Sequence, residues 1–176
     1  MSRWLAVLPL AVLAALAALF GLYALHHDPQ VQPTALVGKP APDLALPSLV
    51  DGQPVRIRAA AGRDGPALVN FFASWCAPCE VEHPVLMGLK DQGVRIVGVA
   101  YKDEPAKTRR FLARLGDPFA EVLADRDGRA GVEFGTTGVP ETYLVAPDGK
   151  ILAKHTGPLT PDEARKLVGK AALTLR

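Results

Sequence analysis

The sequence predicts an α/β fold, in which helices flank a central mixed β-sheet, with an N-terminal β-hairpin extension and an N-terminal transmembrane helix. Short apolar runs of the length of buried strands alternate with stretches whose apolar residues recur at helical spacing. A β-α-β order predicts parallel strands at the sheet centre, and a tight hairpin near the C-terminus adds antiparallel ones. Residues 4–25 carry no charge, and they are long enough to cross a bilayer, which takes roughly 20 residues.

Three segments follow from this pattern: a transmembrane anchor at residues 4–25, a tether at 26–36 and a folded domain at 37–176. Arg3 and the terminal amine precede the apolar segment, so the positive-inside rule predicts a cytoplasmic N-terminus and an exported domain. A cleaved signal peptide is the alternative. We favour a retained anchor because the apolar stretch exceeds a typical signal core and Tyr23 to His26 offers no small-x-small cleavage site.

The elements of the domain are predicted from apolar patterns in chain order. Leu44–Leu46 and Val55–Ile57 alternate on either side of a Gly-containing turn and predict a hairpin. Further strands are expected at 67–73, 94–100, 119–123, 142–146 and 151–156, and helices at 77–90, at 104–115 and after residue 160, with a turn or short helix at 125–131.

Two local motifs define the C-terminal part. The Pro-Asp-Gly sequence at 147–149 lies between two apolar runs and predicts a hairpin turn. Thr160 followed three residues later by Glu163 is a capping box, and Pro161 occupies the favoured first position of a helix. A strand pair and a closing helix are therefore expected to end the domain.

The only two cysteines, Cys76 and Cys79, lie three residues apart in the sequence Trp-Cys-Ala-Pro-Cys. A bridge between them closes a very small loop and constrains the unfolded chain little, so reversible redox chemistry is a better reason for the pair. Cys76 follows an apolar strand and opens a helix, where free N–H groups and the helix dipole favour a thiolate. We expect Cys76 to attack a partner disulfide and Cys79 to resolve the mixed disulfide.

Other readings of the cysteines and of the composition are weaker. A structural disulfide more often joins distant segments. The four histidines have no metal-ligand spacing to the cysteines, so no metal and no cofactor are expected. The formal net charge is +2 without a basic run, so no nucleic-acid partner is expected either.

The strand-Trp-Cys-x-x-Cys-helix arrangement, together with Gly138-Val139-Pro140 far downstream, resembles the thioredoxin superfamily. This resemblance implies a cis peptide bond before Pro140, which would lie against the cysteines. It also implies that the backbone of Val139 is a platform for an extended partner peptide. The alternative is an ordinary proline before a strand.

Within that superfamily the chain is similar to the DsbE/CcmG group, membrane-anchored thiol:disulfide interchange proteins of cytochrome c maturation. The similarity covers residues 37–172 and is most specific in the Tyr-Lys-Asp sequence at 101–103 and the Pro-Glu-Thr sequence at 140–142. It implies a single-pass protein of the bacterial inner membrane whose periplasmic domain reduces apocytochrome c or a maturation partner that carries thiols. A transmembrane thiol reductase would supply the electrons.

The resemblance also implies roles for residues near the cysteines. Many thioredoxins have a buried aspartate where this chain has Asn70, which cannot take a proton, and the group suggests Glu82 as a proton relay for Cys79. A solvated helix carboxylate is the alternative for Glu82. Trp75 is expected to form a partial lid over Cys76, and Glu141 to lie in the peptide groove.

One departure concerns Ala77-Pro78, which stands where other members often have Pro-Thr, so the redox potential does not follow from the sequence. Three other functions stay open at this point. The chain could be a general envelope oxidant, a membrane-anchored thioredoxin for another envelope process, or a module that holds a cysteine-bearing peptide without catalysis.

Overall fold

The structure is a computed structural model that describes residues 4–26, 36–62 and 65–174. Its contacts divide the chain into two compact units, Met1–Gln32 and Pro33–Arg176. The first contains a single described helix, and the second contains the sheet and the cysteine pair. Each unit is described by itself.

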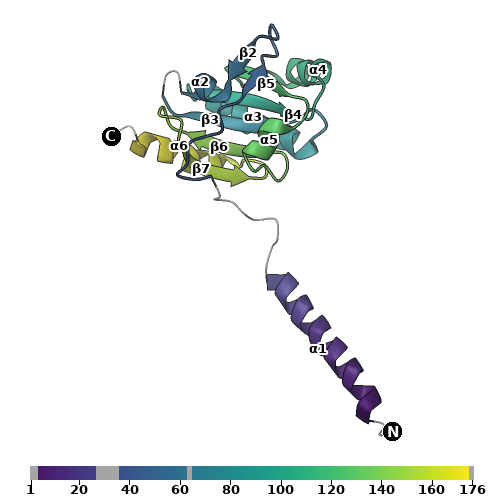
Figure 1. Cartoon of the computed structure of the whole chain (residues 1–176). Helices are drawn as coiled ribbons and strands as arrows, with labels where there is room; N and C mark the ends of the chain where they lie inside the picture. Colours follow the sequence, from purple (N-terminus) through teal and green to yellow (C-terminus); the bar gives the residue numbers. More distant parts are fainter. Residues whose placement is uncertain (1–3, 27–35, 63–64, 175–176) are drawn as a thin grey trace. The chain divides into compact units, whose positions relative to one another are not determined.

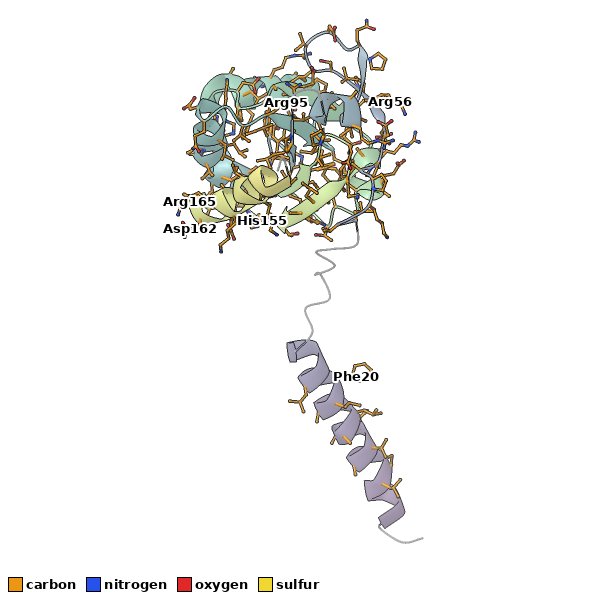
Figure 2. The ribbon with its side chains drawn as sticks, turned by 90° about the vertical axis from the view of Figure 1, so that its left-hand side faces the viewer. Phe20, Arg56, Arg95, His155, Asp162 and Arg165 are labelled. Atoms are coloured by element: carbon orange, nitrogen blue, oxygen red, sulfur yellow. A yellow bond between two sulfur atoms is a disulfide. The ribbon has the colours of Figure 1, made fainter. Side chains whose placement is uncertain are left out.

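Helix α1 spans Trp4–His26 and includes Pro9. Its described large apolar side chains are exposed, and that of Phe20 projects from the helix in Figure 2. None of the described helices reaches the combination of length and apolar character that crossing a bilayer demands. The structure therefore does not support the predicted transmembrane helix at 4–25. Most of the predicted tether at 26–36 lies outside the described residues.

The domain is built on a mixed five-stranded sheet in the order β5-β4-β3-β6-β7 (Figure 1). The pairs β3·β4 and β4·β5 are parallel, whereas β3·β6 and β6·β7 are antiparallel. The five strands are β3 Ala67–Phe72, β4 Ile96–Tyr101, β5 Glu121–Asp125, β6 Glu141–Val145 and β7 Ile151–Thr156. The predicted mixed sheet is confirmed.

The N-terminal hairpin is also confirmed, with one correction. Strands β1 Ala45–Pro47 and β2 Pro54–Arg56 pair antiparallel in a sheet of their own, and β1 approaches β5 through a bridge between Ser48 and Leu123. The prediction that strand continues through Ile57 is wrong, because Ile57 begins the short helix α2, Ile57–Ala61. Ile57 is fully buried in the core, and at five residues α2 is too short to give a helical period in the sequence.

The helices cover both faces of the large sheet, and β3 shows how the sequence divides its side chains between them. Its odd-numbered residues pack in one apolar cluster with α2 and α5, and Leu68 and Phe72 pack in another with α3, α4 and α6. Asn70 is therefore the polar member of the second face. The remaining helices are α3 Ala77–Asp91, α4 Pro105–Leu115, α5 Arg129–Glu133 and α6 Pro161–Thr174.

The predicted capping box at the start of α6 is present. The Glu163 carboxylate accepts hydrogen bonds from the Thr160 backbone N–H at 2.8 Å and from its hydroxyl at 2.7 Å. In the first turn of α6, Asp162 and Arg165 form an ion pair, and Figure 2 labels both. The capping box thus fixes the entry into α6 directly after Leu159, a residue of the site described next.

Candidate active site

The two cysteines form a disulfide at the N-terminus of α3. Cys76 is the N-cap residue with extended backbone, and the Cys79 N–H donates to its Sγ at 3.2 Å. Both residues are almost completely buried. A helix N-terminus stabilises negative charge through its unpaired N–H groups and dipole, so Cys76 lies where a thiolate is favoured after reduction.

Residues next to the cysteines in sequence form the accessible rim of the site. Trp75 is 59% exposed, and its indole Nε1 donates to the Lys102 carbonyl at 3.2 Å. Ala77 and Pro78 are also exposed on the first turn of α3. A partner can therefore approach Cys76 over this rim, while the lid role of Trp75 stays a prediction.

The bond between Val139 and Pro140 is cis, as the resemblance to thioredoxins implied. The Val139 carbonyl oxygen lies 3.4 Å from Cys76 Sγ although the residues are 63 positions apart. In the disulfide this sulfur has no hydrogen, so the approach is a contact, and only a thiol could donate to that oxygen. Pro140 is buried, and its carbonyl accepts from the Gly157 N–H at 2.9 Å. The structure thus brings Val139 and Pro140 against the cysteines.

Glu82 lies one helical turn after Cys79 on the same face of α3, and it is fully buried. Its two carboxylate oxygens accept from Asn70 Nδ2 and from the Leu159 N–H, both at 2.9 Å. Burial raises the pKa of Glu82 to about 7, and the two hydrogen bonds only partly offset this effect. The solvated helix carboxylate considered for Glu82 is therefore excluded.

Glu141, by contrast, does not face the surface. Its side chain is fully buried, and its oxygens accept from Thr137 Oγ1 at 2.7 Å and from the Tyr143 hydroxyl at 2.8 Å. The Lys154 ammonium lies 2.9 Å from Oε2 in a buried ion pair. These contacts put the carboxylate behind the cis-proline loop, and its predicted place in the groove stays a prediction.

Three further buried polar groups near the site were not predicted from the sequence: the Leu159 N–H, the Thr142 hydroxyl and the His83 imidazole. The Leu159 N–H could not be inferred, because a backbone donor 77 positions from Glu82 leaves no signal in the sequence. Thr142 accepts from Asn70 at 3.0 Å, and its only signal is a polar residue in an apolar strand. His83, one of the four histidines without metal-ligand spacing to the cysteines, is buried against the Gly116 carbonyl, and burial lowers its pKa.

In the described part of the chain, no group of three or more His, Cys, Asp or Glu side chains comes together to form a candidate metal site. A cysteine pair at a helix start, opposed by a cis-proline from the antiparallel half of a mixed sheet, defines a thioredoxin-like thiol:disulfide oxidoreductase.

Comparisons with known proteins narrow that class. The Redoxin family model matches residues 36–169. The chain is 45% identical to the thiol:disulfide interchange protein HelX of Rhodobacter capsulatus, covering 96% of this chain and 95% of that protein. It is 37% identical to DsbE of Escherichia coli, covering 92% and 89% of the two chains. The solved structure of MTB DsbF superposes with a TM-score of 0.63 at 29% identity, covering 73% and 95%. The chain thus belongs to the DsbE/HelX family of thiol:disulfide interchange proteins.

Proposed function

We propose that this oxidoreductase works as a reductant in the bacterial periplasm, where it reduces apocytochrome c or a thiol-bearing partner of cytochrome c maturation. The observation that carries the proposal is the pairing of Cys76, next to the cis-proline, with a resolving Cys79 that has a buried carboxyl one turn behind it. The similarity to the DsbE/CcmG group supports the client, and the exposed rim at Trp75 and Pro78 gives the client access.

The reaction proceeds in two exchanges. The Cys76 thiolate attacks one sulfur of the client disulfide, which forms a mixed disulfide and releases the other client sulfur as a thiolate that takes up a proton. Cys79 then loses its proton and attacks the Cys76 sulfur, which releases the second client thiolate. The client gains two electrons, and the protein ends with the Cys76–Cys79 disulfide that the structure contains.

Glu82 is the group best placed to manage the proton of Cys79. Side chains three positions apart on a helix are neighbours, with about 5–6 Å between Cβ atoms. A carboxyl with a pKa of about 7 can accept and return a proton near neutral pH, which general acid–base catalysis requires. Asn70 cannot exchange a proton, and its amide orients the Glu82 carboxylate instead.

The proposed location rests on the sequence. The uncharged segment 4–25 with Arg3 before it favours a single-pass anchor in the inner membrane and a periplasmic domain. In that oxidising compartment the disulfide has to be reduced again, and a transmembrane thiol reductase is the electron donor we propose. An alkaline phosphatase fusion after residue 176 tests the topology: activity in intact cells supports export, and an inactive but stable fusion contradicts it.

Trapping identifies the client. In the native membrane, full-length Cys79→Ala should accumulate a mixed disulfide through Cys76 with apocytochrome c or a maturation thiol protein. Cys76→Ala/Cys79→Ala is the matched control and should capture nothing. A random set of envelope proteins, or no adduct, contradicts the proposed client.

Two further results separate the other functions. A measured reduction potential of about −120 mV, that of a strong oxidant, would indicate electron flow opposite to the one proposed. Complementation of a deletion strain by Cys76→Ser/Cys79→Ser would favour the peptide-holding module over an enzyme. Adducts with thiol proteins of another envelope process would favour a membrane-anchored thioredoxin with a different client.

A further inference from the structure

The carboxylate of Asp103 holds the segment that leads into Cys76. It is nearly buried, at 5% exposed, and it accepts from the Ser74 N–H at 2.8 Å and from the Ser74 hydroxyl at 2.9 Å. It also accepts from the Glu104 N–H and the Thr108 hydroxyl, each at 2.9 Å. The same side chain therefore joins the residue two positions before the nucleophile to the first turn of α4.

The neighbouring residue, Lys102, binds Trp75, the next residue of the same segment. Its carbonyl accepts from the Trp75 indole at 3.2 Å, and its own N–H donates to the Asp125 carbonyl at 2.8 Å. Lys102 has φ of +47°, a left-handed conformation that is uncommon for a residue other than glycine. Such backbone strain persists only where surrounding contacts enforce it, and it clusters at functional sites.

The strand register explains why these residues meet. β3 and β4 run parallel with Phe72 opposite Ala100, so the turns that leave both strands lie side by side at one edge of the sheet. The turn after β3 contains Ser74 and Trp75, and the turn after β4 contains Lys102 and Asp103. Three hydrogen bonds cross between the two pairs.

We propose that the Lys102–Asp103 corner positions the nucleophile, by fixing Ser74 and Trp75 so that Cys76 Sγ stays at the N-terminus of α3. Cys76 is held there by its own N–H bond to Ala73 and by the donation from the Cys79 N–H to its sulfur. If Ser74 moves, this alignment is lost and the thiolate loses its N–H donor. Lys102, Asp103 and Ser74 are thus positioning residues that act through Cys76.

The competing explanation is that Asp103 serves α4 alone, since it also binds Glu104 and Thr108. The two roles use different hydrogen bonds, so they can be separated. Ser74→Ala removes a bond on the cysteine side without a change of charge. Thr108→Val removes a bond to the same carboxylate on the α4 side and is the matched control.

The test uses the reduced full-length chain and a small aromatic disulfide as oxidant, so it needs no client and is independent of the proposed function. We expect Ser74→Ala to slow the reaction with Cys76 by about threefold at pH 7, because one of the two bonds that hold Ser74 on Asp103 is lost. Thiolate absorbance against pH should show a higher apparent pKa of Cys76 in this variant. Thr108→Val should match the wild type in both measurements. If Ser74→Ala and Thr108→Val react at the same rate and give the same apparent pKa, whether both change or neither does, the proposal is overturned.

Asp103→Asn gives a second test, because the two explanations predict opposite changes in the rate at which Cys76 reacts. Removal of a nearby negative charge should by itself favour the thiolate and speed its attack. The new amide keeps one acceptor oxygen and loses the other, so one of the two Ser74 bonds is lost, which should slow the reaction by about threefold. A faster Asp103→Asn variant contradicts positioning, and if this variant does not fold, the Ser74→Ala result decides alone.

Lys102 is tested by two variants that both remove its charge. Glycine adopts a φ of +47° easily, and a β-branched valine does not. Lys102→Val should therefore react at least about threefold more slowly than Lys102→Gly, because the carbonyl that binds Trp75 is displaced. Equal rates for the two variants would show that the backbone conformation of Lys102 plays no part.

Discussion

Glu82 and Glu141 are both fully buried in the same domain, one a helical turn after Cys79 and the other directly after the cis-proline, but their partners differ. Glu82 receives hydrogen bonds from neutral donors, the Asn70 amide and the Leu159 N–H. Glu141 forms an ion pair with the buried Lys154 ammonium and accepts from Thr137 and Tyr143. Two buried glutamates of this domain thus have different environments: Glu82 has only neutral hydrogen-bond donors, and Glu141 has a cation.

The difference separates a carboxyl that can exchange a proton from one that holds a loop. A buried carboxylate without a cation pays for its desolvation by keeping its proton to higher pH, as the pKa of about 7 for Glu82 reflects. Lys154 compensates the charge of Glu141 and also donates to the Gly135 carbonyl at 3.1 Å. This second carboxylate therefore ties down the loop that ends at Val139 and Pro140.

The largest expected effect comes from removing the cation of Glu141. Lys154→Met leaves a buried carboxylate without its partner, which typically costs about 3–5 kcal/mol. The free energy of unfolding, measured by urea denaturation of the full-length chain at pH 7, should fall by that amount.

Lys150→Met is the control for this substitution, because Lys150 is exposed on the turn before β7. Its unfolding free energy should stay within about 0.5 kcal/mol of the wild type. If Lys154→Met costs less than about 1 kcal/mol, Glu141 does not depend on its cation, and the contrast between the two glutamates is lost.

The second prediction concerns pH and Glu82. The folded carboxyl keeps its proton up to about pH 7, whereas an unfolded glutamate ionises near pH 4.5. Between these values the unfolded state binds fewer protons than the folded state, so stability falls as pH rises through this window. The contribution of Glu82 to this loss should be roughly 3 kcal/mol between pH 4 and pH 8.

Glu82→Gln isolates that contribution, since other titrating groups remain in both proteins. The stability of the wild type minus that of Glu82→Gln should decline from pH 4 to pH 8 and level off above pH 8. The resolving step of thiol exchange, followed by release of a mixed disulfide, should also lose its pH dependence near 7 in the variant. A flat difference curve would mean that Glu82 ionises normally despite its burial.

This contrast also marks how far the sequence predicts the site. The cysteine pair, the cis bond at Pro140 and the position of Glu82 one turn after Cys79 are local or carried by motifs, and the structure has all three. The environment of Glu141 is not local, since Lys154 reaches it from β7 through the pairing of Tyr143 with Lys154. A carboxylate in the first position of a strand gives no sign of such a partner.

The same distinction applies to the fold. Short apolar runs predicted the five strands of the large sheet, because period and burial are properties of each segment. Helix α2 was missed because its five residues are held by packing of Ile57 and Ala61 beneath the sheet, a tertiary effect that no short window shows.

The smallest expected effect tests whether Lys154 alone holds Glu141. Thr137 is exposed, and its hydroxyl donates to Glu141 Oε1 at 2.7 Å, so Thr137→Ala removes one bond and leaves the ion pair intact. We expect a loss of about 1 kcal/mol in urea denaturation, well below the cost of Lys154→Met. Thr137→Ser keeps the hydroxyl and should retain most of the wild-type stability. If the alanine and serine variants lose the same amount, the methyl group of Thr137 is responsible, and Glu141 relies on Lys154 and Tyr143 to hold the cis-proline loop.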